Sequence, residues 1–269
     1  MADTASRRNI YSLTWIYRVD PAFHLLSALA QDAGKAEFLV ALENRDSSVT
    51  LRGAYSLAGL RADADLMFWV WGPDLDALQR LAVALRQSGL GRYLRQVEAY
   101  VGVVSAPRYD PEHGPAFTTG APPKKYVSVY PFVKTTEWYL LPYEERRELM
   151  KEHGEVGRKY AVPREKVVEL ARAARGEAPA RNGARTATDT RAKAAAGTDE
   201  EGGGVLSNTV DAYALSDYEF ILANESDDPD ELKAMMLALR AVQVRRYTKS
   251  DTPFYFGRLR EPAEALAEL

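Results

Sequence analysis

YVSVYPFVKTTEWYLLPYEERRELMKEHGEVGRKY, residues 126–160, is the stretch that decides the fold. Its first nine residues alternate between a mostly valine face and a face of larger or polar side chains, as in a half-buried strand. A turn follows, and then Leu149, His153, Val156 and Tyr160 recur at helical spacing. The stretch predicts a strand, a turn and an amphipathic helix, which place Tyr130, Lys134 and His153 where one flat ligand could contact all three.

His153 stands in the apolar stripe of the expected helix, where a hydrophobic side chain would be typical. A buried histidine needs partners for both ring nitrogens. Two explanations remain open from the pattern alone. One is a core histidine bonded to a carbonyl, and the other is a ligand to a metal or haem iron.

Composition narrows the class of protein. The chain has 269 residues and is 46% hydrophobic, so it can bury a sizeable core. Its net charge is −3, which gives no electrostatic reason to expect nucleic-acid binding. It has no cysteine, which excludes disulfides, thiolate ligation of haem and iron–sulfur clusters. No apolar run approaches the roughly 18 residues of a membrane span, and the first 15 residues lack the apolar core of a signal peptide. We therefore expect a cytoplasmic protein.

The sequence contains an internal repeat. Residues 64–93 resemble residues 218–247, with Leu85-Arg86 matching Leu239-Arg240 at an offset of 154. Two copies of this length indicate a duplicated supersecondary unit rather than a solenoid. Each copy predicts the order βαββαβ, which is ferredoxin-like. The expected strands are 10–18, 48–56, 66–71 and 97–105 in the first copy, and 126–134, 209–214, 219–224 and 253–258 in the second. The expected helices are 21–44, 74–88, 142–160 and 229–244. We therefore predict an α+β fold of two packed sheets.

Three motifs carry a resemblance to a known family: YPFVK, WYLLP followed by EERR, and EHGEVGRKY. Together they resemble the coproheme decarboxylases of the chlorite dismutase family. The form with VYPF, and with His113 seventeen residues before Tyr130, is similar to the actinobacterial branch. The resemblance covers roughly residues 9 to 262, apart from one insertion.

The resemblance implies a fold and an activity. The fold is a tandem of ferredoxin-like halves that form a dimeric α+β barrel-type subunit, assembled as a homo-oligomer, commonly a pentamer. The activity is the hydrogen-peroxide-dependent oxidative decarboxylation of iron coproporphyrin III (coproheme) to haem b, with coproheme as both substrate and redox centre. This is the last step of a haem-synthesis route, so transient contact with the upstream ferrochelatase is also implied.

The resemblance also implies roles for individual residues. His153 would be the axial iron ligand and Tyr130 the residue that forms a radical, which takes a hydrogen atom from a propionate before carbon dioxide leaves. Lys134 would hold a propionate, although relatives often have arginine here, and lysine loses the bidentate geometry. His113 would be a distal base for peroxide. The ordinary alternatives are a core histidine, a half-buried tyrosine, a solvated lysine and a solvent-exposed loop histidine.

Four further residues are expected near the porphyrin edge: Phe132, Tyr100, Arg245 and Arg246. Tyr100 could equally be an ordinary strand tyrosine, and Arg245 and Arg246 could equally be surface cations. Phe220 stands where the family pattern has tryptophan. A tryptophan radical is therefore excluded at this position, which favours Tyr130 as the reactive residue.

Three segments are expected along the chain: an N-terminal half (9–105), a connecting loop (106–125) and a C-terminal haem-binding half (126–262). Residues 171–204 interrupt the second half. These 34 residues hold 11 alanines and 6 glycines and no large apolar side chain, so we expect a disordered surface insertion.

Two other functions remain open. A chlorite dismutase-like haem enzyme or peroxidase would need a distal arginine, and none precedes Tyr130 at the expected place, where His113 stands. A non-catalytic haem-binding protein would need the same ligand site without the radical chemistry.

Overall fold

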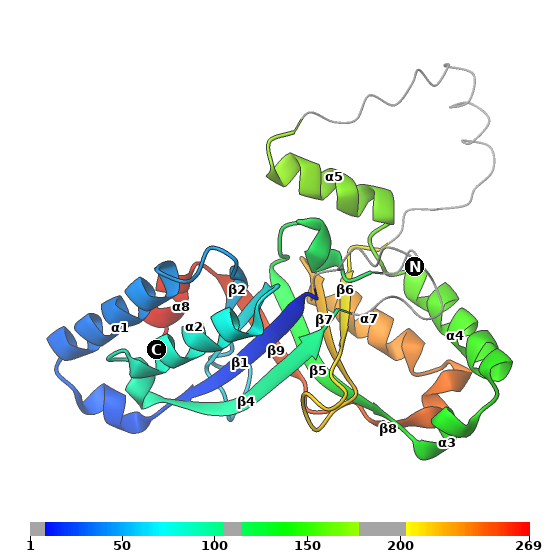
Figure 1. Ribbon diagram of the computed structural model, residues 1–269, viewed down its shortest axis with the longest axis horizontal. Coiled ribbons are helices and arrows are strands. Elements are labelled where there is room, and N and C mark those ends of the chain that lie inside the picture. Colours follow the sequence, from blue (N-terminus) through cyan, green and yellow to red (C-terminus); the bar gives the residue numbers. More distant parts are fainter. Residues whose placement is uncertain (1–8, 105–113, 178–202) are drawn as a thin grey trace, which may run out of the picture.

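The computed structural model describes residues 9–104, 114–177 and 203–269. Two similar halves follow one another along the chain (Figure 1). The first half consists of β1 (Tyr11–Val19), α1 (Ala28–Glu43), β2 (Thr50–Ser56), β3 (Leu66–Gly72), α2 (Leu75–Gln87) and β4 (Leu94–Val103), with short 3-10 turns at Pro21–Leu25 and Gly91–Tyr93. This order is βαββαβ, as the sequence predicts.

The second half repeats the order with additions. Its elements are β5 (Tyr126–Lys134), α3 (Thr136–Leu140), α4 (Tyr143–Arg158), α5 (Arg164–Ala174), β6 (Leu206–Asp211), β7 (Phe220–Ser226), α7 (Pro229–Leu239), β8 (Thr248–Ser250), β9 (Tyr255–Arg260) and α8 (Pro262–Ala267). Further 3-10 turns lie at Ala116–Thr119 and Gln243–Tyr247. None of the described helices is long and apolar enough to cross a membrane.

The strand pairing shows the duplication directly. The first half has the order β4-β1-β3-β2, and the second has β9-β5-β7-β6, so each half places its four strands in the same order. The halves join where β2 pairs with β9 and where β4 meets β6 at Val103 and Asp211. Because β5 also pairs with β7, the strand pairings of the two halves form a closed ring. The prediction of two packed sheets is wrong, because the strands of both halves pair into one sheet. The protein is therefore an α+β fold of two fused ferredoxin-like halves.

Two large apolar clusters stabilise this arrangement. One lies between the first half of this sheet and the helices α1, α2 and α8, which cover its outer face (Figure 1). The other cluster lies between the strands of the two halves, where Trp69 and Tyr100 of the first half meet Val127 and Tyr255 of the second. A buried ion pair crosses between the halves, because Arg52 of β2 contacts Glu225 of β7 at 2.6 Å. Removing either partner would leave an uncompensated buried charge.

The helix starts follow the sequence repeat. The side chain of Asp74 accepts a hydrogen bond from the Asp76 amide at the start of α2, and Asp228 accepts one from Asp230 at the start of α7. These are N-caps at equivalent positions. The strand over 126–134 is observed as predicted. The expected helix over 229–244 is shorter, because α7 ends at Leu239 and a separate turn begins at Gln243.

The expectation of disorder over 171–204 is wrong at its ends. Residues 171–174 belong to α5, and Ala171 is buried among Ala116, Val162 and Leu206. At the other end, the Gly203 amide donates to the Lys159 carbonyl. Residues 178–202 lie outside the described part of the chain.

We predict that residues 178–202 are dispensable, because they carry no large apolar side chain that could contribute to a core. Replacing them with a Gly/Ser link of about twelve residues should leave the melting temperature and ligand binding nearly unchanged. The larger deletion, 171–204, is the matched control and should lower the melting temperature, because it removes buried Ala171. Calorimetry of both variants checks this, and a large loss of stability or binding in the shorter deletion would contradict it.

Candidate active site

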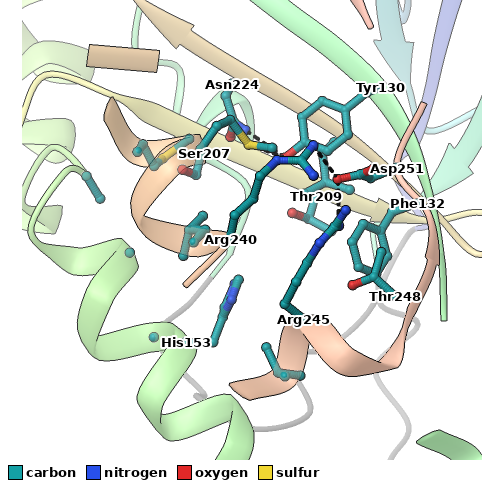
Figure 2. Close-up of a pocket in the computed structure, with 18 of the residues that line it drawn as sticks. Tyr130, Phe132, His153, Ser207, Thr209, Asn224, Arg240, Arg245, Thr248 and Asp251 are labelled. Carbon is teal, nitrogen blue, oxygen red and sulfur yellow. Dashed lines mark hydrogen bonds and ion pairs between the residues drawn. The ribbon is translucent and has the colours of Figure 1, made fainter. Parts of the chain in front are cut away.

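A pocket lies in the second half, between its sheet and the helices α4 and α7 (Figure 2). The space between its walls measures about 920 Å³, part of which is open to solvent. Strands β5, β6 and β7 provide Tyr130, Phe132, Ser207, Thr209, Leu222 and Asn224. The helices and the turns that follow provide His153, Gly154, Gly157, Met235, Met236, Arg240 and Arg245, and Asp251 directly follows β8. Lys134 and Arg158 also line it.

The internal duplication explains why the pocket is in this half. β1 and β5 are related by an offset of 115 residues, and so are α1 and α4. Under this offset, Tyr130 corresponds to Trp15 and His153 corresponds to Phe38. Trp15 and Phe38 belong to the packed cluster between sheet and helices in the first half. The second half thus has a cavity where the first half has a core.

Helix α4 forms one wall of this cavity. All of its residues are described, and none of them is fully buried. His153 is half-buried rather than buried, and it lies on the helix face that lines the pocket. Gly157, one turn further on, also lines the pocket, and a Cβ atom there would meet nothing within 4 Å. A flat group can therefore approach this face of α4 closely.

Tyr130 lies deep in the opposite wall, with 3% of its surface exposed (Figure 2). Its hydroxyl accepts a hydrogen bond from Asn224 Nδ2 at 3.3 Å and lies 3.5 Å from the sulfur of Met236, to which it donates. The Phe254 ring packs on it at 4.5 Å between centroids. Burial raises the pKa of Tyr130 well above its usual value, so the phenol keeps its proton at neutral pH.

Lys134 is held between aromatic rings at the end of β5. Its Nζ lies 4.3 Å from the centroid of Trp138 and 5.0 Å from that of Phe132. Burial lowers the pKa of Lys134 to about 8; Glu219 opposes this shift, whereas Arg245 adds to it. Lys134 is therefore a cation whose charge changes near neutral pH.

Two arginines share one buried carboxylate in the pocket. Asp251 Oδ2 accepts from Arg240 Nη2 at 3.0 Å and from Arg245 Nη1 at 2.7 Å. In the view of Figure 2, both arginine side chains extend between His153 and Tyr130. The three side chains together carry one net positive charge, so this part of the pocket favours an anion.

The structure brings together five of the residues expected from sequence: Tyr130, Phe132, Lys134, His153 and Arg245. Two others are placed elsewhere, since neither Tyr100 nor Arg246 lines the pocket among the described residues. Alternation along β4 turns Tyr100 into the cluster between the strands of the two halves, against the rings of Tyr218 and Tyr255. His113 lies outside the described residues.

The sequence interpretation missed Asn224, Arg240 and Asp251. The repeat contained a signal for the first of these, because Asn224 corresponds to the buried Val70 at the offset of 154. A polar side chain at a core position indicates a special environment. Arg240 and Asp251 carry no comparable signal in the sequence, since only folding places them side by side.

The donor set fits a flat, anionic ring with a metal at its centre. A neutral imidazole from His153 could ligate iron from one face, beside the open space at Gly157. Arg240, Arg245 and Lys134 could hold carboxylate arms, and Phe132, Leu222 and Leu239 offer apolar surface to the ring. Tyr130 is a neutral phenol that could react with such an arm.

Fold and site together define an α+β protein of two ferredoxin-like halves with a pocket for an anionic ligand in the second half. The Chlorite dismutase family model matches residues 31–171 and 194–260. The chain therefore belongs to the chlorite dismutase family.

Named relatives refine the comparison. A coproheme decarboxylase from Mycolicibacterium smegmatis is 36% identical over 216 residues, which cover 80% of this chain and 75% of the relative. Among solved structures, chlorite dismutase from Candidatus Nitrospira defluvii in complex with imidazole has a TM-score of 0.72 at 21% identity, covering 96% of this chain and 94% of that one. A mutant of the same enzyme gives 0.74, also at 21% identity, covering 98% of this chain and 96% of that one. The structural likenesses establish the fold alone.

Proposed function

We propose that this protein is a hydrogen-peroxide-dependent coproheme decarboxylase, an oxidoreductase that converts iron coproporphyrin III to haem b. One observation carries the proposal: His153 and Tyr130 face a single pocket at positions where the other half has the packed side chains Phe38 and Trp15. The 36% identity to a coproheme decarboxylase supports the choice of substrate.

In this proposal, His153 ligates the substrate iron, and Arg240, Arg245 and Lys134 hold propionate arms. Bound iron porphyrin supplies oxidising power from peroxide. Tyr130 then gives up a hydrogen atom and recovers one from the β-carbon of a propionate. Each cycle turns one propionate, one peroxide and one proton into a vinyl group, carbon dioxide and two waters, with peroxide accepting both electrons. His113 is proposed as the distal base that assists peroxide.

A direct assay separates this proposal from its alternatives. The purified protein is mixed with iron coproporphyrin III and peroxide, and the product is followed by pyridine haemochrome spectra. Formation of haem b supports the proposal. Ligand binding without conversion would overturn it in favour of a non-catalytic haem-binding protein.

A chlorite dismutase activity is the second candidate, because Arg240 and Arg245 reach the pocket from α7 and the turn after it. Arginine is a suitable partner for an oxyanion such as chlorite. Asp251 already binds both guanidinium groups, which counts against such a role. Rapid oxygen release from chlorite, without conversion of coproheme, would favour this candidate.

We further propose a cytoplasmic homopentamer that transiently contacts the upstream ferrochelatase. Supporting self-association, Leu25 and Leu29 near the start of α1 expose 87% and 81% of their surfaces. Analytical ultracentrifugation measures the number of copies.

The pKa of Lys134 gives a pH prediction. As pH rises through about 8, Lys134 loses its charge, so it attracts a carboxylate less strongly. Affinity for coproporphyrin should therefore fall as pH rises from about 7 to 9, by up to roughly tenfold, which corresponds to about 1.4 kcal/mol. Fluorescence titration at several pH values measures this.

Two variants of Lys134 serve as controls. Lys134→Arg stays charged throughout this range, so it should bind tightly with little pH dependence. Lys134→Gln should bind weakly at every pH. An unchanged pH profile in Lys134→Gln would show that another group is responsible.

A further inference from the structure

Asp251 is the most buried charged side chain of the described pocket wall, with 8% of the side chain exposed. It follows β8, whereas Arg240 caps the end of α7 and Arg245 lies in the turn at Gln243–Tyr247. One oxygen, Oδ2, accepts from both guanidinium groups. Three separate segments of the chain are thus joined at a single atom.

This arrangement fixes the positions of two otherwise mobile side chains. The side chains of Arg240 and Arg245 are 43% and 32% exposed, so packing alone restrains them weakly. A guanidinium has five N–H donors, and the bonds to Asp251 use one nitrogen of each arginine. The remaining donors can bind further carboxylates in the pocket. Without the shared carboxylate, the two like charges would also repel each other.

We propose that Asp251 is a positioning residue that orients Arg240 and Arg245 to bind the carboxylate arms of a porphyrin. It thereby determines how strongly the pocket prefers a porphyrin with four carboxylate arms to one with two. This inference rests on the proposed function. The substrate has four carboxylate arms and the product has two. A pocket that distinguishes them binds the substrate and releases the product.

The test uses iron-free porphyrins, so that it does not depend on turnover. Dissociation constants are measured by fluorescence for coproporphyrin III, which has four carboxylates, and mesoporphyrin IX, which has two. The parent protein should prefer coproporphyrin III by at least about tenfold. In Asp251→Ala this preference should fall at least about fivefold, because the arginines lose their anchor. Asp251→Asn keeps an acceptor oxygen in the same place and should retain more of the preference than Asp251→Ala.

Two further variants control for general effects. Asp63→Ala removes a carboxylate paired with Arg61 at 2.6 Å, outside the pocket, and should leave the preference unchanged. If Asp251→Ala does not fold, Arg240→Gln and Arg245→Gln provide the test. Each should reduce the preference at least about threefold, whereas exposed Arg147→Gln on α4 should not.

An unchanged preference in folded Asp251→Ala, or in both arginine variants, would overturn the inference. So would a parent protein that binds both porphyrins equally. A parent protein that binds coproporphyrin III selectively but does not convert coproheme would instead contradict the proposed function.

Discussion

Replacing Tyr130 by phenylalanine is expected to leave coproheme binding near normal, while carbon dioxide release falls by on the order of a thousandfold, comparable with the loss of a side chain that transfers a proton. The ring remains packed against Phe254, so the pocket keeps its shape. The lost hydroxyl accepts a hydrogen bond from Asn224, and its removal should cost only about 0.5–1.5 kcal/mol of folding stability. Binding and chemistry are thereby separated.

Tyr126→Phe is the matched control for this variant. Tyr126 lies on the same strand, stacks on Phe256 at 5.6 Å between centroids, and is not among the described residues that line the pocket. It should retain full activity. Stopped-flow spectra should show that the iron still reacts with peroxide in Tyr130→Phe. Normal carbon dioxide release by that variant would eliminate Tyr130 as the reactive residue.

Replacing His153 by alanine is expected to remove the axial iron ligand and weaken coproheme binding at least about tenfold. The fold should survive, because His153 is half-buried on a helix that buries none of its described residues. Added imidazole should enter the space left by the side chain and restore the absorption spectrum of a histidine-ligated iron. Absorption and circular dichroism spectra measure ligation and folding separately.

His24→Ala is the control for His153→Ala, because His24 lies in the first half, where its ring meets Phe23 at 6.0 Å. It should leave the spectrum unchanged. A five-coordinate histidine spectrum in His153→Ala without added imidazole would assign the ligand to another residue.

Local patterns predicted the elements that carry Tyr130 and His153. Period-two alternation placed the strand over 126–134, and helical spacing placed His153 on the pocket face of α4. These signals are local because each depends on neighbours within one element. The same period explains the misplaced Tyr100, since a strand pattern identifies two faces without saying which of them meets a ligand.

Contacts between distant segments could not be predicted in the same way. Arg240, Arg245 and Asp251 meet only after α7, the following turn and β8 have folded together. The location of the cavity likewise depends on a comparison between halves. Phe38 is buried because α1 packs tightly on its sheet, whereas its counterpart His153 lines a cavity because α4 packs loosely. Spacing within one segment contains no information about how closely a helix approaches its sheet.

The most direct test of the account is mass spectrometry of the porphyrin during a titration with peroxide. The full-length parent protein is loaded with iron coproporphyrin III, and peroxide is added in steps. The account predicts two successive losses, each of one carbon dioxide and two hydrogens, at about one peroxide per loss, ending in haem b; in Tyr130→Phe the starting mass should persist. Bleaching of the porphyrin without either loss in the parent protein would contradict the central claim, as would complete conversion by Tyr130→Phe.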